Sequence, residues 1–122
     1  MASNTIKAQV AASPRAAFPG SFDMVAGSTV LQLGSSYTVA NSNTVIINFS
    51  GGTLTVALPD AASYPYRHLF FCNKGGGAIN ADASVVGPLA GGAQGTAICG
   101  AGAGKWAHLV SNSGNWEIIG GN

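Results

Sequence analysis

The sequence predicts an all-β protein: a small antiparallel β-sandwich, jelly-roll-like, or a partly closed barrel. Three observations support this class. Short runs rich in β-branched and aromatic residues recur from residue 28 onward, connections rich in Gly, Ser and Asn separate them, and no amphipathic helix of useful length is visible. Many short strands with glycine-rich turns are typical of sandwiches and barrels. We therefore expect an extended N-terminal arm over residues 1–27 and a β-sandwich domain over residues 28–122.

The N-terminal stretch differs from the rest of the chain. Pro14 and Pro19 interrupt any helix that the neighbouring alanines could start, and no hydrophobic period holds across this stretch. Its apolar residues favour an extended arm docked on another protein surface. A loop folded back on its own domain is the alternative, and the sequence leaves both open. The residues expected to make the arm's contacts are Ile6, Val10, Arg15, Phe18 and Phe22.

The first half of the domain contains four strand-like runs. Residues 29–33 and 37–40 are short and lie on either side of a Gly-Ser-Ser turn, whereas residues 44–49 and 53–58 flank Ser50-Gly51-Gly52. Two such runs around a short glycine-containing connection predict a hairpin. Side chains alternate along a strand, so we expect the following six to form core: Val45, Ile47, Phe49, Leu54, Val56 and Leu58.

The second half begins with a proline-containing segment, residues 59–65, which ends the predicted hairpin because proline cannot continue a central strand. Residues 67–72 form the most continuously hydrophobic run and are expected to be a strand buried on both faces. The remaining expected strands are residues 78–80, 84–86 and 96–99, followed by a closing hairpin over 106–111 and 116–119.

Charge is scarce in this chain. Charged residues make up 7% of it, against about 25% in an ordinary soluble domain. A monomer usually keeps a mixed charged surface for solubility and to protect its sheet edges, so we expect partners to cover this one. A monomer with a surface of Ser, Thr, Asn and Gly is the alternative. The five Lys and Arg residues are scattered, which excludes the basic stripe that nucleic-acid binding needs.

No targeting signal is apparent. The first residues lack the basic and apolar regions of a secretory signal, and no apolar run approaches the roughly 20 residues that span a bilayer. We therefore expect synthesis in the host cytoplasm, a soluble product and no membrane partner. Cys72 and Cys99 lie in apolar runs and are expected to be buried free thiols. A disulfide between them is the alternative, which a cytosolic product disfavours.

Few groups are available for catalysis. The acids are Asp23, Asp60, Asp82 and Glu117. Asp60 and Asp82 occupy turn-like segments, where an Asp commonly hydrogen-bonds its own backbone, and alternation places Glu117 opposite the apolar face of its strand. No paired-carboxylate site is predicted.

Metal and phosphate motifs are also missing. His68, His108 and the cysteines are residue types that zinc accepts, but they form no CxxC or HxxxH pair. Copies of either histidine could bind an ion around a symmetry axis. The run Gly100–Lys105 fails as a phosphate-binding loop, because Cys99 stands where its first glycine belongs and Trp106 replaces its Ser or Thr. We predict no enzyme activity, no metal and no cofactor.

Two aromatic residues, Tyr64 and Tyr66, fall in the proline-containing loop. Amphipathic rings are favoured at protein contacts, so we expect them to make an oligomer or ligand contact, for example by stacking on a sugar. The alternative is that they cap an open end of the sandwich.

Three segments together resemble a module that recurs in phage and prophage structural proteins: residues 53–61 (TLTVALPDA), 69–75 (LFFCNKG) and 106–119 (WAHLVSNSGNWEII). The shared theme is a strand ending in Leu-Pro, an apolar strand ending in Asn-x-Gly, and a closing hairpin with Asn-Trp-x-Ile-Ile. The resemblance covers about residues 44–119. It implies a virion protein, because such modules occur in tail fibres, tail knobs and capsid decoration proteins, commonly as trimers.

The size of the chain favours one of these roles. One compact module with a short apolar arm suits a capsid decoration (cement) protein, which would bind the outer capsid surface and bridge neighbouring capsid subunits. Its expected partners are further copies of itself, as a homotrimer, and the major capsid protein. The alternative is a tail fibre or tail knob tip that binds a host receptor or a surface glycan.

Overall fold

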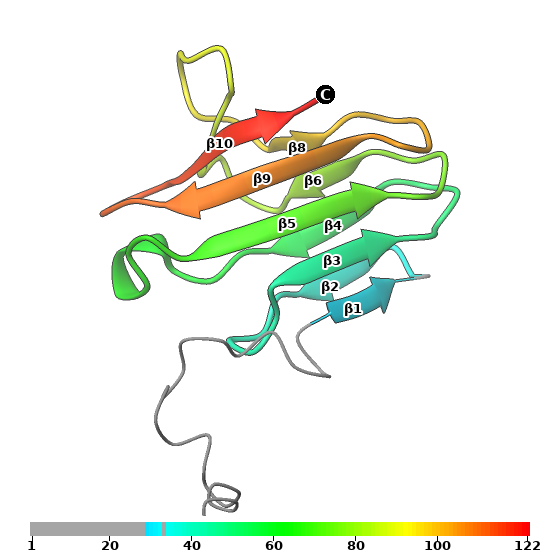
Figure 1. Cartoon of the computed structure of the whole chain (residues 1–122), viewed down its shortest axis with the longest axis horizontal. Coiled ribbons are helices and arrows are strands. Elements are labelled where there is room, and N and C mark those ends of the chain that lie inside the picture. Colours follow the sequence, from blue (N-terminus) through cyan, green and yellow to red (C-terminus); the bar gives the residue numbers. More distant parts are fainter. Residues whose placement is uncertain (1–28, 33) are drawn as a thin grey trace, which may run out of the picture.

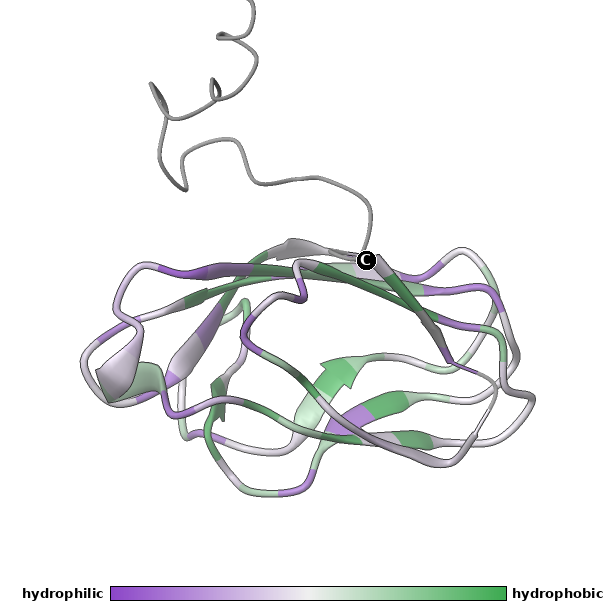
Figure 2. Ribbon diagram, turned by 90° about the horizontal axis from the view of Figure 1, so that it is seen from below, coloured by the Kyte–Doolittle hydropathy of each residue, from purple (hydrophilic) through white to green (hydrophobic). Residues whose placement is uncertain are grey.

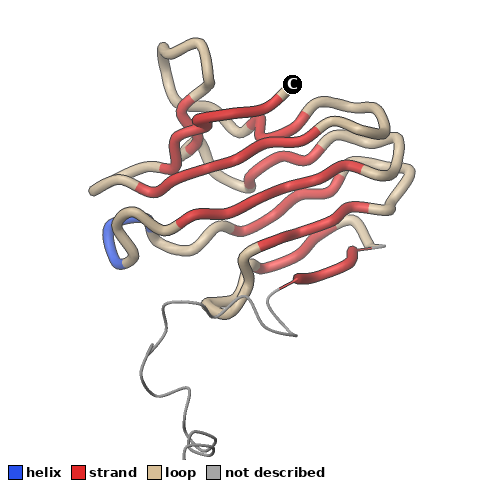
Figure 3. The backbone as a smooth tube through the Cα atoms, in the orientation of Figure 1, coloured by secondary structure: helices blue, strands red, loops and turns tan. Residues whose placement is uncertain are grey.

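The computed structural model, which describes residues 29–32 and 34–122, consists of two β-sheets packed face to face (Figure 1). One sheet has six strands in the order β1-β3-β5-β9-β10-β7, and the other has four in the order β2-β4-β6-β8. The strands are β1 (Thr29–Gln32), β2 (Ser36–Thr38), β3 (Val45–Asn48), β4 (Leu54–Ala57), β5 (His68–Asn73), β6 (Ile79–Ala81), β7 (Val86–Gly87), β8 (Ala97–Cys99), β9 (Trp106–Ser111) and β10 (Trp116–Gly121), and a short 3₁₀ turn, η3, covers Ala61–Ser63. The predicted all-β sandwich is therefore confirmed (Figure 3).

The predicted N-terminal arm lies outside the described residues. The same holds for the five residues assigned to its contacts, Ile6, Val10, Arg15, Phe18 and Phe22. Their role remains a prediction.

Strand pairing is mixed, which corrects the expectation of a purely antiparallel sandwich. Neighbours β1–β3, β3–β5, β2–β4, β4–β6 and β7–β10 run parallel, whereas β5–β9, β9–β10 and β6–β8 run antiparallel. The reason is visible in Figure 1: successive strands from β1 to β6 alternate between the two sheets. The chain thus winds through three coils, each made of one strand in each sheet: β1–β2, β3–β4 and β5–β6.

The predicted hairpin of residues 44–49 and 53–58 is wrong for this reason. The turn Ser50-Gly51-Gly52 carries the chain from β3 in one sheet to β4 in the other, so the two strands face each other across the core instead of pairing. The closing hairpin is correct, because β9 and β10 pair with each other in antiparallel register.

The core lies between the sheets, which Figure 2 shows as two separate layers. Leu54, Val56, Leu69, Phe71 and Leu109 are fully or almost fully buried there. Trp116 is also buried in this core. Its indole Nε1–H donates to the carbonyl oxygen of Pro59 over 2.9 Å. Leu54 and Val56 confirm the predicted inward face of β4, and Leu58 packs against the core.

The predicted inward face of β3 is wrong. Ile46 and Asn48 point into the core and are fully buried, so Val45 and Ile47 face outward and Phe49 is 46% exposed. Strand β5 is also buried on one face only, since Leu69, Phe71 and Asn73 point inward. On β3 the prediction followed Val45, Ile47 and Phe49 and left Asn48 off the core face, and on β5 it followed the continuous hydrophobic run and placed Asn73 in the turn.

The buried asparagines pair with each other. Asn48 and Asn73 are directly opposite in the parallel register of β3 and β5, and Asn48 Nδ2 donates to Asn73 Oδ1 over 3.3 Å. Asn48 Oδ1 accepts from the Ser50 amide at 2.9 Å. Asn73 Nδ2 donates to the carbonyl oxygens of Gly77 and, at 3.0 Å, of Gly100. Each amide therefore satisfies backbone groups of the turn that follows its own strand, which a buried polar group requires.

The turns that follow these asparagines stack on one another. A Cβ on Gly75 would collide with the carbonyl oxygen of Ser50, and one on Gly77 would collide with that of Gly52. The run 100–104 adds a further layer, because Gly102 N donates to Gly76 O over 3.2 Å and Gly104 N donates to Asn73 O over 2.7 Å. This run is therefore held in place by the stack.

The stacked turns predict a sharp contrast between adjacent glycines. Gly77→Ala should lower the free energy of unfolding by about 1–3 kcal/mol, because the backbones of two turns must separate. Gly76→Ala is the matched control, since its Cβ would lie 3.7 Å from the nearest atom, the carbonyl oxygen of Gly51. Urea unfolding followed by circular dichroism measures both; equal effects of the two changes would contradict the stacking.

The buried amides give a second prediction. Asn73→Ala should destabilise the fold by about 2–4 kcal/mol, because two carbonyls lose their donor inside the protein. Asn41→Ala, at an exposed turn position, should change stability by no more than about 0.5 kcal/mol. Thermal and urea unfolding of both variants provide the test, and a loss at Asn73 no larger than at Asn41 would rule out the proposed role of the pair.

Candidate functional site

The outward face of the six-stranded sheet is the most distinctive surface of the molecule. We call it the outer apolar face and define it by Val45, Ile47, Phe70, Cys72, Trp106 and Val110, with His68 and His108 among them. The parallel and antiparallel registers bring these side chains together, since Phe70 lies opposite both Val45 and His108, and Cys72 lies opposite both Ile47 and Trp106. Three strands thus form one continuous patch.

Aromatic surface and the near absence of charge characterise this face. Trp106 is 43% exposed and Phe70 is 36% exposed. Among the outward positions of the described strands of this sheet, Glu117 is the only charged residue, and it lies on β10 opposite Val110. Exposed apolar patches of this kind mark interaction surfaces.

The other outer face of the sandwich is polar. On the four-stranded sheet, the outward positions of β2, β4, β6 and β8 carry short hydroxyl, amide and methyl side chains: Ser36, Thr38, Thr55, Ala57, Asn80 and Ala97. Hydroxyl and amide groups are well solvated. One outer face of the sandwich is therefore mainly apolar and aromatic, whereas the other carries short hydroxyl, amide and methyl groups.

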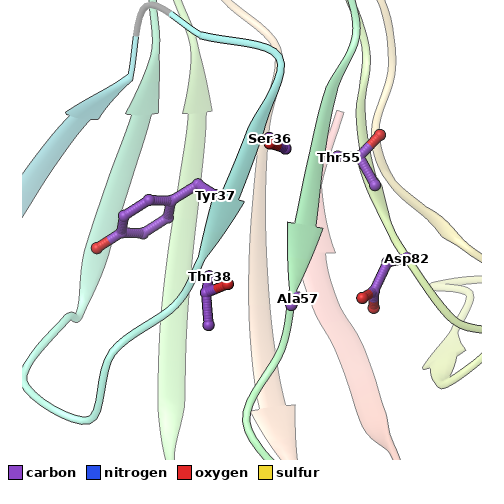
Figure 4. A pocket seen from close by; sticks show the side chains of 6 residues that line it. All are labelled: Ser36, Tyr37, Thr38, Thr55, Ala57 and Asp82. Carbon is purple, nitrogen blue, oxygen red and sulfur yellow. The ribbon is translucent and has the colours of Figure 1, made fainter.

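A shallow hollow lies on the polar face, lined by Ser36, Tyr37, Thr38, Thr55, Ala57 and Asp82 (Figure 4). The Tyr37 ring points away from Thr55 and Asp82, and its hydroxyl donates to Asn43 Oδ1. Hydroxyls and one carboxylate face the hollow, without a ring on which a sugar could stack.

The two histidines meet within the outer apolar face. Nδ1 of His68 and Nε2 of His108 are 2.7 Å apart, and the Phe70 ring stacks on His108 with centroids 4.0 Å apart. Burial, followed by the neighbouring His68, lowers the pKa of His108. The sequence named both residues but gave no sign of their contact, because 40 positions separate them.

The predicted aromatic loop is exposed and rigidly anchored. Tyr66 is 79% exposed and has a φ of 63°, a left-handed conformation that a bulky residue rarely adopts. Ser111 holds the loop, because its hydroxyl donates to Tyr64 O and accepts from the Arg67 amide at 2.8 Å. Arg67 Nη2 adds hydrogen bonds to the carbonyls of Ala40 and Asn43.

Arg67 also approaches Tyr64. Its guanidinium carbon lies 5.6 Å from the centre of the Tyr64 ring, within the range of a cation–π contact. Desolvation lowers the pKa of Arg67, partly offset by Tyr64. The loop that carries both tyrosines is therefore held in place by hydrogen bonds to other parts of the fold. The contact that the two rings make with a partner remains a prediction.

The described acids do not form a catalytic cluster. Asp60 Oδ2 accepts a hydrogen bond from the Ser63 hydroxyl at 2.7 Å in the 3₁₀ turn, and Glu117 Oε2 accepts from Asn112 Nδ2 at 3.1 Å. Among residues 29–32 and 34–122, no three His, Cys, Asp or Glu side chains gather where they could hold a metal ion.

The two cysteines are free and differ in burial. Cys99 is buried between the sheets, and desolvation, together with the nearby Cys72, raises the pKa of its thiol to about 11 despite the opposing charge of Lys105. A thiol with this pKa is protonated at neutral pH and is a poor nucleophile. Cys72 is half-buried on the outer apolar face.

Sequence reasoning missed the residues that define this site. Phe70 was expected inside, no face was assigned to Trp106, and the burial of Asn48 and Asn73 was not foreseen. A usable signal was present: an amide residue precedes each glycine- or serine-rich turn at Gln32, Asn48 and Asn73. The three amides are in register across neighbouring strands, so the residues next to Asn48 and Asn73 in their strands point to the outer face.

Comparison of the chain with protein-family models, with curated proteins and with solved structures finds no match to any of them. Within the part of the chain that the structure describes, no helix has the length and apolar character needed to cross a membrane.

The thiols give a direct test of this geometry. At pH 7–8, iodoacetamide should modify Cys72 in the native protein well before Cys99, because Cys99 is buried and protonated. Peptide mapping by mass spectrometry measures the two rates, and unfolding in guanidinium should equalise them. Native rates that are already equal would contradict the position of Cys99.

Proposed function

We propose that this chain is a non-enzymatic virion protein of a bacteriophage, a capsid decoration (cement) protein that binds the outer surface of the shell and bridges neighbouring capsid subunits. One observation carries the proposal: the sandwich has an outer apolar face on one sheet and a hydroxyl-bearing face on the other. A molecule of this kind suits attachment by one side, with the other side in water.

The energy available on the outer apolar face supports a protein contact. An aromatic side chain presents about 150–250 Å², so the exposed fractions of Phe70 and Trp106 leave on the order of 150–200 Å² of ring surface in water. Covering it would contribute about 4 kcal/mol per copy at about 25 cal/mol per Å². This is modest for one contact.

Repetition makes such modest contacts tight. A homotrimer attached through three copies of the face gains affinity from effective concentration, without any new kind of contact. The scarcity of charge on the face also avoids the cost of burying unpaired ions. The major capsid protein is the proposed partner on the shell, and further copies of the chain are the proposed partners within the trimer.

The assignment to a phage particle rests on the resemblance of residues 44–119 to modules of phage structural proteins. In this interpretation, the predicted arm and the anchored loop with Tyr64 and Tyr66 contact neighbouring subunits. The polar face remains outward on the capsid surface.

A second candidate is a tail fibre or tail knob tip that binds a host receptor or a surface glycan. The observation in its favour is the loop of Tyr64 and Tyr66, which holds two exposed rings on a rigid base. The hollow beside Asp82 is less suited to a glycan, because the ring of Tyr37, the one aromatic residue among its six lining residues, points away from Thr55 and Asp82.

Location in the particle tests the proposal. Quantitative mass spectrometry and cryo-electron microscopy of purified virions of the encoding phage should find hundreds of copies on the shell. A handful of copies at the tail, with adsorption of the free protein to host cells, would replace the proposal with the second candidate.

Matched substitutions on the two faces test the mode of attachment. Phe70→Lys combined with Trp106→Lys should abolish binding of the purified protein to shells that lack it, because two charges would be buried without partners. Thr38→Lys combined with Thr55→Lys, on the polar face, should leave binding within about twofold, since exposed substitutions have small effects. Retained binding in the first variant, with a native circular dichroism spectrum, would exclude the outer apolar face.

A further inference from the structure

The histidine pair is chemically distinct from the rest of the outer apolar face. In the antiparallel register of β5 and β9, His68 lies opposite Val110 and Phe70 lies opposite His108, so the two histidines are diagonal neighbours. Their ring planes are tilted by 36°, with centroids 5.0 Å apart. Nδ1 of His68 and Nε2 of His108 therefore face each other at 2.7 Å.

Packing and exposure suit this pair to a ligand. Phe70 stacks nearly parallel to His108, at an interplanar angle of 20°, and limits the rotation of its ring. His68 is exposed, so an ion can reach the pair from solvent. A single hydrogen bond between exposed groups contributes little to stability, and the fold itself does not require two histidines here.

We propose that His68 and His108 form a chelating pair for a divalent transition-metal ion of the class that imidazole prefers, namely Zn²⁺, Ni²⁺ or Cu²⁺. The donor atoms are Nδ1 of His68 and Nε2 of His108. This inference stands independently of the proposed virion role.

The distance between the donors is close to what chelation requires. Metal–nitrogen bonds of about 2.0–2.1 Å place two donors about 2.9 Å apart at a right angle and about 3.4 Å apart at a tetrahedral angle. The donors are 2.7 Å apart, so a small rotation of the exposed His68 ring admits the ion.

Metal binding requires no net loss of protons from the histidine pair. In the neutral pair, one facing nitrogen carries a hydrogen and donates it to the other. Binding requires both facing nitrogens to be bare, so that hydrogen moves to the far nitrogen of its own ring, and the pair as a whole loses no proton. Water, or a group from another molecule, completes the coordination of the ion. Mg²⁺ and Ca²⁺, which prefer oxygen ligands, are excluded.

Metal titration of the full, untagged chain tests the proposal. Isothermal titration with Zn²⁺ and Ni²⁺ in excess Mg²⁺ should show saturable binding of one ion per chain or per two chains. His68→Asn and His108→Asn should each weaken binding by at least about tenfold, the lower bound for loss of a metal-site partner. Cys72→Ser is the matched control on the same face and should leave the affinity unchanged.

An NMR measurement on the wild-type chain tests the same two donor atoms without relying on substituted variants that fail to fold. In the wild-type chain, Zn²⁺ should shift the ¹⁵N resonances of Nδ1 of His68 and Nε2 of His108, leaving the far nitrogens protonated. The proposal is overturned if neither resonance moves at saturating metal, if Cys72→Ser alone abolishes binding, or if the folded wild-type chain binds neither ion at millimolar concentration.

Discussion

Two asparagine side chains, Asn48 and Asn73, lie at equivalent positions on neighbouring parallel strands and are fully buried. Because water is excluded, their amides must find partners within the protein. They find them in each other and in the backbone of the turns that follow, which fixes where each strand ends and where the chain crosses to the second sheet. A shift by one residue would bury an apolar side chain at that position and leave the turn carbonyls without donors, so the register of the coils depends on this pair.

The stacked turns follow from the same constraint. Once the asparagines align the coils, the connections after β3 and β5 lie against each other, and only glycine fits at Gly75 and Gly77. The run 100–104 joins the stack and accepts a hydrogen bond from Asn73. Gly75 and Gly77 thus serve close backbone packing at one end of the sandwich.

The outer apolar face is a further consequence. With Asn48 and Asn73 directed inward, the alternation of β3 and β5 sends Ile47, His68, Phe70 and Cys72 outward, and the antiparallel pairing of β9 adds Trp106 and His108 beside them. The same register therefore specifies the core, the proposed docking surface and the proposed metal-binding pair. The other sheet presents hydroxyl, amide and methyl groups, and this difference between the two faces is the basis of the proposed one-sided attachment.

The sequence by itself determined the all-β class, most strand positions, the closing hairpin and the loop that carries Tyr64 and Tyr66, because β-branched runs and turn residues such as Gly and Pro act locally. The tertiary structure decided which strands pair and which way they face. A turn such as Ser50-Gly51-Gly52 can return a chain within one sheet or carry it across to another, and local pattern does not distinguish the two. Burial of Asn48 and Asn73 reverses the faces expected from hydropathy, since an amide is stable inside only where other coils supply its partners. The contact of His68 with His108 likewise exists only because distant strands become neighbours.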